Sequence, residues 1–159
     1  MSEKLNSTKI VKIGIVVKDI EEAAKRYNEL FDLKEEAVVR YPDPLKKPLE
    51  GAYKKLRGEE VTPKLKSCIV NLDPVYLEIV EPFDDTPSPW LEYLKNYGPG
   101  VCFISFYVDG FEHQIDLMEQ GGYPMTFVEE KMFERYAYFE TQEKLGVTIE
   151  LKERQSREK

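Results

Sequence analysis

Two short segments of this chain, far apart in the sequence, match each other and carry a glutamate at the same position. Tyr76-Leu77-Glu78-Ile79-Val80-Glu81 aligns with Thr148-Ile149-Glu150-Leu151-Lys152-Glu153. Both segments have the composition of β-strands. A carboxylate is a side chain that can accept a proton as a general base or bind a hard cation such as Mg²⁺. Glu78 and Glu150 occupy the same position in the two matching segments.

A second pair of matching segments keeps the same order along the chain. Residues 12–20 match residues 103–111, and each segment is a β-branched and aromatic run that stops at Asp or Gly and then becomes helical. Two ordered matches indicate an internal repeat. The predicted order is one strand, one helix and three strands, twice, which is an α+β fold of two tandem βαβββ modules. Because one module alone would expose the inner face of its sheet, we expect the two sheets to form an open barrel enclosing a cleft.

Local signals place the elements within this scheme. Asp19 and Glu22 form an N-cap pair, Asp73-Pro74 marks a hairpin turn, and Ser88-Pro89 begins a short helix that ends at Gly98. The expected strands are 9–17, 37–39, 67–72, 75–81, 101–108, 123–128, 133–140 and 147–152, and the expected helices are 20–31, 88–98 and 111–120. We expect one domain over residues 9–153, with module 1 at 9–82, a connector at 83–100, module 2 at 101–153 and a disordered tail at 154–159.

Residues 42–66 interrupt the repeating pattern. The segment carries Pro42, Pro44, Pro48 and Pro63 and shows no clear periodicity. It is too long for a plain connection between two strands. We expect either a solvated insertion or a lid over a ligand, with a short helix around 49–56 as an alternative local structure.

Composition restricts the partners and the compartment. The net charge of −7 argues against nucleic-acid binding, because phosphates require a basic face. No apolar run is long enough to span a membrane, and the N-terminus lacks a signal-peptide core. Cys68 and Cys102 both lie in predicted strands and are too few for a disulfide framework. We expect a soluble, cytoplasmic protein with two buried thiols and no nucleic-acid or membrane partner.

The chain resembles the vicinal oxygen chelate (VOC) superfamily, most closely its glyoxalase and methylmalonyl-CoA epimerase-like branch. The resemblance spans residues 9–153, and its final segment is the most specific. The residues that carry it are 13–19, Leu77-Glu78-Ile79-Val80-Glu81-Pro82, Ser88-Pro89-Trp90, Gly98-Pro99-Gly100, 136–141 and 145–151. This resemblance implies a divalent metal between the two sheets, with one ligand from the first strand and one from the last strand of each module. Carried over by position, the ligand places fall on Lys12, Glu78, Phe103 and Glu150.

The sequence departs from the family pattern at two of these four places. Glu78 and Glu150 keep carboxylates, but Lys12 is protonated at neutral pH and Phe103 has no donor atom. We therefore expect no tightly bound transition metal and no other cofactor, although the two glutamates could hold Mg²⁺ weakly through waters. A conventional metalloenzyme with a shifted ligand register is the alternative.

We expect Lys12, Glu78 and Glu150 to form a buried ionic cluster in place of the metal. As catalytic residues, a glutamate would take a proton next to a carbonyl while Lys12 stabilises the enolate oxygen. As structural residues, the same three would form an inert salt bridge. If Phe103 faces the cleft, as the resemblance implies, alternation along its strand places Ser105 and Tyr107 there too. Tyr76, Tyr136 and Tyr138 also lie on strands. The expected ligand-binding residues are Phe103, Ser105, Tyr107, Tyr76 and Tyr138, with ordinary core packing as the alternative for each. His113 lies off the apolar face of its helix and is expected to be solvated.

The resemblance implies an isomerase, epimerase or lyase-like enzyme that acts on a carbonyl or acyl metabolite, CoA-linked or free, without the usual metal. Lysines 46, 47, 54, 55, 64 and 66 either meet a phosphate or CoA tail or form a solvated charge run. We expect a homodimer with a small-molecule ligand. The alternative is a non-catalytic protein of the bleomycin-resistance type, which would bind or sequester a ligand in an aromatic cleft.

Overall fold

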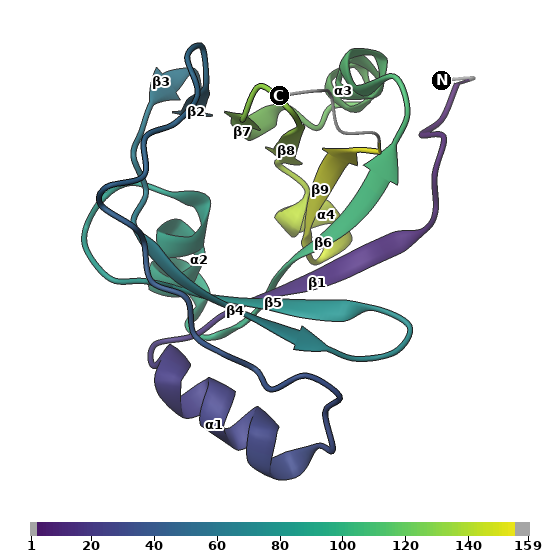
Figure 1. The fold of residues 1–159 in the computed structure, drawn as a ribbon. Coiled ribbons are helices and arrows are strands. Elements are labelled where there is room, and N and C mark those ends of the chain that lie inside the picture. Colours follow the sequence, from purple (N-terminus) through teal and green to yellow (C-terminus); the bar gives the residue numbers. More distant parts are fainter. Residues whose placement is uncertain (1–2, 155–159) are drawn as a thin grey trace.

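The computed structural model describes residues 3–154, which form one curved, open sheet of nine strands with four helices (Figure 1). The strand order is β3-β2-β7-β8-β9-β6-β1-β5-β4. The elements are β1 Ile10–Val16, α1 Ile20–Leu30, β2 Tyr53–Leu56, β3 Glu59–Glu60, β4 Leu65–Asn71, β5 Tyr76–Pro82, α2 Pro89–Tyr97, β6 Gly100–Val108, α3 Phe111–Gln120, β7 Met125–Glu130, β8 Arg135–Phe139, α4 Gln142–Leu145 and β9 Thr148–Glu153. The mixed α+β class is as predicted, and the expected open barrel takes the form of one nine-stranded sheet that is not closed into a barrel.

The two matching segment pairs occupy equivalent places in the sheet. β1 runs parallel to β5 and β6 runs parallel to β9, and the antiparallel pairing of β1 with β6 joins the two arrangements at the centre. A helix follows the first strand in both cases, and α1 begins where Asp19 accepts a hydrogen bond from the Glu22 backbone at 3.1 Å. The repeat read from the sequence is therefore a repeat of strand pairing.

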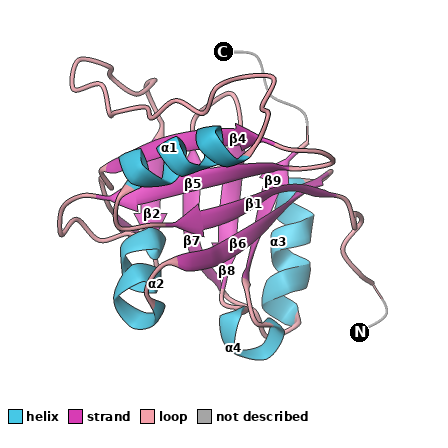
Figure 2. Cartoon of the chain, turned by 90° about the horizontal axis from the view of Figure 1, so that it is seen from below, coloured by secondary structure: helices cyan, strands magenta, loops and turns pink. Residues whose placement is uncertain are grey.

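Each long helix covers the outer face of its own half of the sheet. α1 packs on β4 and β5 through a cluster that includes Ile20, Ala24 and Ile79. α3 packs on β7 and β9 through Phe111, Met118 and other apolar side chains. Figure 2 shows the two helices at separate places against the sheet. This leaves the inner, concave face for a third cluster, to which β1, β2, β5, β6, β7, β8 and α2 contribute.

Gly14 in β1 allows the closest contact on this inner face. A Cβ atom at residue 14 would lie 1.9 Å from Cε1 of Phe103. The Phe103 ring therefore lies directly over the β1 backbone, and its side chain is buried. No side chain larger than hydrogen fits between β1 and this ring.

The expected strand at 37–39 is absent. The side chain of Asn28 takes both backbone groups of Ala37: Nδ2 donates to the Ala37 carbonyl at 2.9 Å, and Oδ1 accepts from the Ala37 N–H at 2.8 Å. These groups are then unavailable for a strand ladder. A single bridge between Arg40 and Ser67 is all that the segment contributes to the sheet.

Residues 42–66 contain a β-hairpin, and the alternative of a short helix around 49–56 is wrong. β2 and β3 are joined by Arg57 and Gly58, which have φ values of 50° and 84°. Two consecutive residues with positive φ form the tight turn that suits two-residue hairpins. β2 pairs antiparallel with β7, so a segment from the first half of the chain extends the sheet of the second half. This pairing was missed because nothing local in 42–66 points to β7.

The remaining elements lie close to the predicted ranges. Residues 142–145 form a one-turn helix. α3 buries Phe111, Gln114, Leu117 and Met118, and Ile115 packs, partly buried, against the same cluster as Phe111 and Met118. Both cysteines are free and buried. Of the expected tail, Arg154 binds Asp109 at 3.1 Å, and residues 155–159 lie outside the described residues. No helix in the described part is long and apolar enough to cross a membrane.

The contact between Gly14 and Phe103 can be tested by Gly14→Ala. We expect the free energy of unfolding to fall by about 1–3 kcal/mol, because the added methyl group must displace the Phe103 ring. Urea denaturation of Gly14→Ala, Phe103→Leu and the double variant measures the effect. The double variant is expected to lose less stability than the sum of the two single losses, and strict additivity would contradict the contact.

Candidate functional site

The four family ligand places come together at the centre of the inner face. Lys12 lies on β1, Glu78 on β5, Phe103 on β6 and Glu150 on β9, and these strands are neighbours in the order β9-β6-β1-β5. Gly14 of β1 lies opposite both Glu78 and Phe103 in the strand registers, and Ser105 lies opposite Glu150. The side chains face inward because each occupies the same phase of the strand alternation.

Lys12 lies between the two glutamates. Its Nζ atom is 3.4 Å from Oε1 of Glu78 and 3.6 Å from Oε1 of Glu150. The same ammonium group lies 5.6 Å from the centre of the Phe103 ring. The side chains are exposed to different extents: 8% for Lys12, 1% for Glu150 and 26% for Glu78. Within this ionic cluster, formed by Lys12, Glu78 and Glu150, solvent reaches Glu78 most readily.

Electrostatics keep Lys12 charged in spite of its burial. Desolvation by burial lowers the pKa of Lys12, but the carboxylates of Glu150 and Glu78 outweigh it, and the pKa is raised above its ordinary value. Burial and the nearby Glu78 raise the pKa of Glu150, while Lys12, Ser105 and Tyr138 partly offset this. Glu150 is therefore the carboxyl group that holds a proton more strongly than usual.

The hydroxyl group of Ser105 donates a hydrogen bond to Oε1 of Glu150, and both residues are fully buried. Ser105 was expected to contact a ligand. In this structure it lies behind Glu150 on the next strand and fixes the position of that carboxyl group. Tyr76 and Tyr107, from the same set of candidates, are partly exposed.

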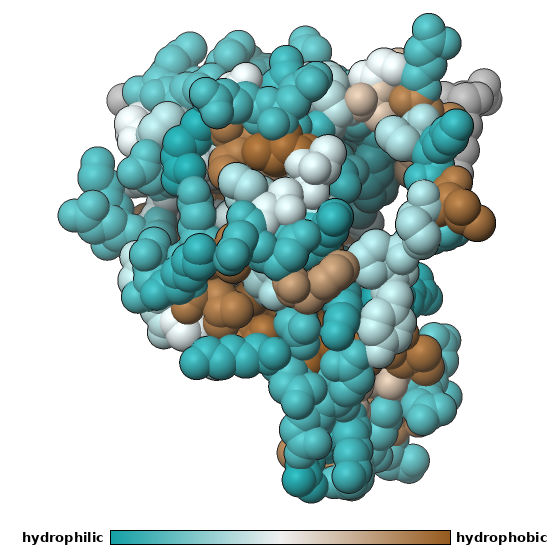
Figure 3. All heavy atoms as spheres, turned by 90° about the vertical axis from the view of Figure 1, so that its left-hand side faces the viewer, coloured by the Kyte–Doolittle hydropathy of each residue, from teal (hydrophilic) through white to brown (hydrophobic). Residues whose placement is uncertain are grey.

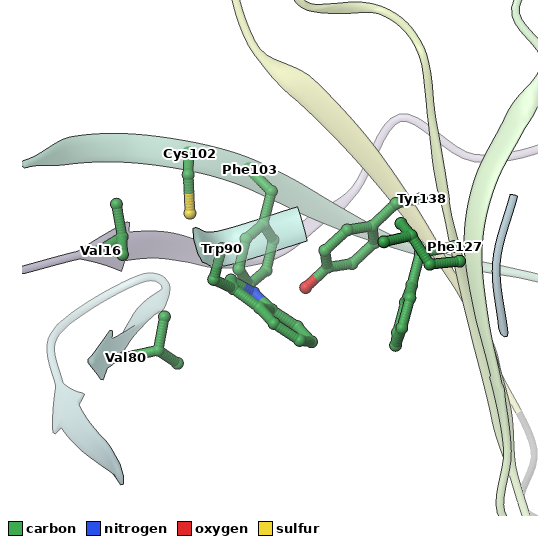
Figure 4. Packing of buried hydrophobic residues seen from close by; sticks show 8 residues of the cluster. Val16, Val80, Trp90, Cys102, Phe103, Phe127 and Tyr138 are labelled. Carbon is green, nitrogen blue, oxygen red and sulfur yellow. The ribbon is translucent and has the colours of Figure 1, made fainter. Parts of the chain in front are cut away.

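Aromatic side chains fill the inner face beside the ionic cluster. The ring of Phe103 is 5.0 Å from that of Tyr138, and Trp90 meets Phe127 and Tyr138 edge-on at 5.4 Å and 5.7 Å (Figure 4). Phe103 and Tyr138 are almost completely buried. They therefore support the site from behind and expose little surface to a ligand. Trp90 lies on α2, and it reaches this wall because α2 packs against β1, β5 and β6.

Trp90 leaves one polar atom without a partner. Its side chain is buried, and Nε1 has no hydrogen-bond partner among residues 3–154. A buried N–H donor is normally paired with an acceptor or a water. The sequence signal for this residue was the pair Ser88-Pro89 before it, which predicts a helix but not the direction that the helix faces.

Other candidates lie outside the cluster. His113 is exposed on α3 and contacts Glu3, in agreement with a solvated histidine. Among the six lysines of residues 42–66, Lys46, Lys47 and Lys54 line a cavity that is described below. Lys55 lies over the Tyr53 ring, Lys64 pairs with Asp84, and Lys66 pairs with Glu21 and Glu81.

An acidic group that the sequence did not suggest lies at the start of α1. Asp19, Glu21 and Glu81 place one carboxylate oxygen each within 4.8 Å of one another. Lys66 is 3.4 Å from Glu21 and 3.6 Å from Glu81, and Glu81 also accepts a hydrogen bond from the Ile20 backbone. A lysine ammonium therefore already pairs with two of the three carboxylates.

The four family places do not fit a tightly bound divalent metal. They offer two carboxylate groups, a phenyl ring and an ammonium group that lies between the carboxylates. Transition metals in proteins are bound by imidazole, thiolate and carboxylate groups in a closed set of ligands. Lys12 contributes positive charge here and no lone pair.

The comparison with family models agrees with the fold and with this arrangement of strands. Residues 12–139 match the model of the Glyoxalase/Bleomycin resistance protein/Dioxygenase superfamily. The chain belongs to this superfamily. No curated protein matches the sequence.

Solved structures with the same fold include methylmalonyl-CoA epimerases. The enzyme from Mycobacterium tuberculosis is 16% identical, with a TM-score of 0.62 over 96% of this chain and 92% of that chain. A hypothetical protein from Bacillus halodurans C-125 is 19% identical, with a TM-score of 0.63 over 95% of this chain and 97% of that chain. A methylmalonyl-CoA epimerase in complex with methylmalonyl-CoA and NH4+ is 17% identical, with a TM-score of 0.57 over 94% of this chain and 95% of that chain. At these identities the similarity shows the fold.

The role of Lys12 as counter-charge predicts the behaviour of Lys12→Met. Removal of the ammonium leaves Glu150 buried beside Glu78, and we expect a loss of about 3–5 kcal/mol in the free energy of unfolding near neutral pH. Because the folded pKa of Glu150 is raised, the folded state keeps a proton that the unfolded state has lost. The free energy of unfolding then falls as the pH rises from the pKa of Glu150 in the unfolded state to its pKa in the folded state. Lys12→Met extends this loss of stability to higher pH.

Urea denaturation at pH 5 and pH 8 measures this prediction. The loss in free energy of unfolding caused by Lys12→Met is expected to be smaller at pH 5 than at pH 8. Adding Glu150→Gln to the Lys12→Met chain should restore part of that free energy. Lys54→Met is the matched control, because Lys54 is 40% exposed and lies 3.9 Å from Glu129. Its loss should stay below about 1 kcal/mol at both pH values. Equal deficits for Lys12→Met at both pH values would count against a buried ion cluster.

Proposed function

We propose that this protein is an enzyme that transfers a proton at a carbon next to a carbonyl group, of the isomerase, epimerase or lyase type, and that it works without a divalent metal. The observation that carries the proposal is the position of Lys12 Nζ, 3.4 Å and 3.6 Å from the carboxylates of Glu78 and Glu150. Because Lys12 lies where the family resemblance places a metal ligand, its ammonium group is the natural substitute for the cation.

Glu78 is the best candidate for the base. Its side chain is 26% exposed, whereas Glu150 is buried and holds a hydrogen bond from Ser105. Glu78 would accept the proton, and the electron pair of the broken C–H bond would move to the carbonyl oxygen and form an enolate. Return of the proton to the opposite face of that carbon would invert its configuration, and return to a neighbouring carbon would isomerise the substrate; either step regenerates the Glu78 carboxylate and completes the cycle.

Lys12 is the candidate for stabilising the enolate oxygen. An ammonium group has three N–H donors, and that of Lys12 donates one hydrogen bond to Glu78 at 3.4 Å while Glu150 lies 3.6 Å away as an ion pair. A remaining donor in a desolvated site stabilises a developing negative charge more than it would in water. One structural neighbour contains methylmalonyl-CoA together with NH4+, so this fold holds an acyl-CoA in the presence of an ammonium ion.

A non-catalytic binding protein is the second candidate function. Trp90, Phe127 and Tyr138 form an aromatic wall of the kind that holds organic ligands, and Trp90 Nε1 lacks an acceptor among the described residues. On this proposal the ionic cluster shapes the inner face but does no proton transfer. The two functions differ in whether a bound carbonyl compound exchanges a proton with solvent.

Exchange in D₂O tests the enzymatic proposal. The metal-stripped protein is incubated with methylmalonyl-CoA and with simpler carbonyl compounds, and deuterium incorporation is followed by mass spectrometry. We expect catalysed exchange that EDTA does not reduce. Glu78→Gln should slow exchange by about 10²–10⁴-fold because the base is lost. Lys12→Met should slow it by about 10²–10³-fold because the enolate loses its donor.

Glu92→Gln is the matched control for these variants. It removes the charge of an exposed carboxylate that pairs with Arg57 outside the cluster, and exchange should be unchanged. Exchange that disappears with EDTA and returns with added metal would contradict the metal-independent mechanism. Saturable binding of a carbonyl compound without any exchange in the unmodified protein would favour the binding function instead.

A further inference from the structure

A cavity is present whose lining does not include the ionic cluster. It has a volume of about 680 Å³ and separates residues 46–63 from the strands and turn of residues 129–133. Lys12, Glu78 and Glu150 do not line it. This volume is in the range of sites that bind small organic molecules. The cavity exists because β2 pairs with β7, which holds the 46–63 segment beside the second half of the sheet.

The wall of the cavity is largely apolar. Pro48 and Leu49 line it from the loop, Val61 and Pro63 follow β3, and Phe133 faces them from the β7–β8 turn. The Leu49 side chain is 45% exposed although it lines the cavity. Figure 3 views the molecule from the side of β2 and β3 and shows hydrophobic side chains surfacing within a mainly hydrophilic face. An apolar surface of this kind favours a ligand with an apolar body.

Charge on the loop side of the cavity is positive. Lys46 and Lys47 line the cavity, are exposed, and form no salt bridge within the described part of the chain. The lining also contains Lys54, which pairs with Glu129, and Lys131, which pairs with Glu134.

Two of the glutamates that line the cavity accept hydrogen bonds on β7, across the cavity from the loop, and the third lies on the β2–β3 hairpin. Glu129 accepts a hydrogen bond from the Tyr136 hydroxyl, and Glu130 accepts one from the Met132 backbone. Glu60 lies across from Lys55 in the β2–β3 register. The two lysines of the loop thus remain as the cationic end of an apolar cavity.

We propose that this cavity is a second binding site, which takes an organic anion with an apolar body and one terminal carboxylate or phosphate group. The apolar body lies against Leu49, Val61 and Phe133, and the anionic end meets Lys46 and Lys47. The site is independent of the proton-transfer chemistry proposed for Lys12, Glu78 and Glu150, because it shares no residue with that cluster. Occupation of the site ties the 46–49 segment to the β7–β8 turn.

Isothermal titration calorimetry with three ten-carbon probes tests the proposal: decanoate, decyl phosphate and the neutral decanol. We expect both anions to bind with a stoichiometry of one and decanol to bind at least about tenfold more weakly, since it lacks the charge. Tighter binding of decyl phosphate than of decanoate would assign the natural ligand to phosphates, and the reverse to carboxylates. Equal binding of decanol and the anions, or no binding of either anion, would overturn the proposal.

Two double variants separate local charge from net charge. The double variant Lys46→Gln/Lys47→Gln should lower the affinity for decanoate by about tenfold. Lys25→Gln with Lys34→Gln makes the same change in net charge at exposed positions that do not line the cavity, and should leave the affinity within about twofold. Equal losses in both double variants would reduce the effect to overall charge and overturn the site.

Two single variants complete the test. Leu49→Asn changes a half-exposed residue of the wall, so the protein should fold normally, and decanoate should bind several-fold more weakly. Glu78→Gln removes the proposed base and should leave decanoate affinity unchanged, whatever the outcome of the exchange experiment. Loss of decanoate binding in Glu78→Gln would show that the anion binds at the ionic cluster and would overturn a second site.

Discussion

An ammonium group held between carboxylates from the two halves of the sheet is the interaction on which the inner face depends. Glu78 comes from the first half of the chain and Glu150 from the second, and Lys12 lies between them beside the β1–β6 junction. Desolvation of a buried ion pair offsets much of its attraction, so the cluster adds less stability than its charges suggest. Removal of one member is costly because it leaves a buried charge alone. The arrangement therefore specifies which side chains meet at the centre of the sheet.

The packing around the cluster decides what can reach it. Gly14 lets the Phe103 ring lie across β1, and Phe103, Tyr138 and Trp90 then close the space on that side. Ser105 holds Glu150 from behind. Glu78 is left as the carboxylate nearest to solvent. A ring and an amine thus stand at the two places where the family resemblance implies nitrogen ligands.

The same physical solution occurs at the start of α1. Lys66 pairs with Glu21 and Glu81 as Lys12 pairs with Glu78 and Glu150, and the side chains of the two lysines are only 23% and 8% exposed. The β2–β3 hairpin adds a different feature, because it carries residues of the first half onto β7. This exchange produces the cavity beside residues 46–63, at a distance in the fold from the residues that resemble the family site.

The sequence by itself determined the repeat and most of the elements. Alternating apolar residues, the Asp19 cap, the Asp73-Pro74 turn and the two matched glutamates are local signals, and each corresponds to the element that the structure shows. The meeting of Lys12, Glu78, Phe103 and Glu150 was implied by the family resemblance, and the structure brings these four residues together on neighbouring strands.

Tertiary structure alone decided the rest. Ala37 failed to form a strand because Asn28, nine residues earlier, took its backbone groups. Residues 53–60 became a hairpin on β7, and Trp90 turned into the inner face, because distant partners were available there. The Glu78 side chain is 26% exposed and the Glu150 side chain only 1%, although the two residues occupy matching places in the repeat. That difference arises from packing between elements far apart in the chain, and it determines which of two equivalent carboxylates faces solvent.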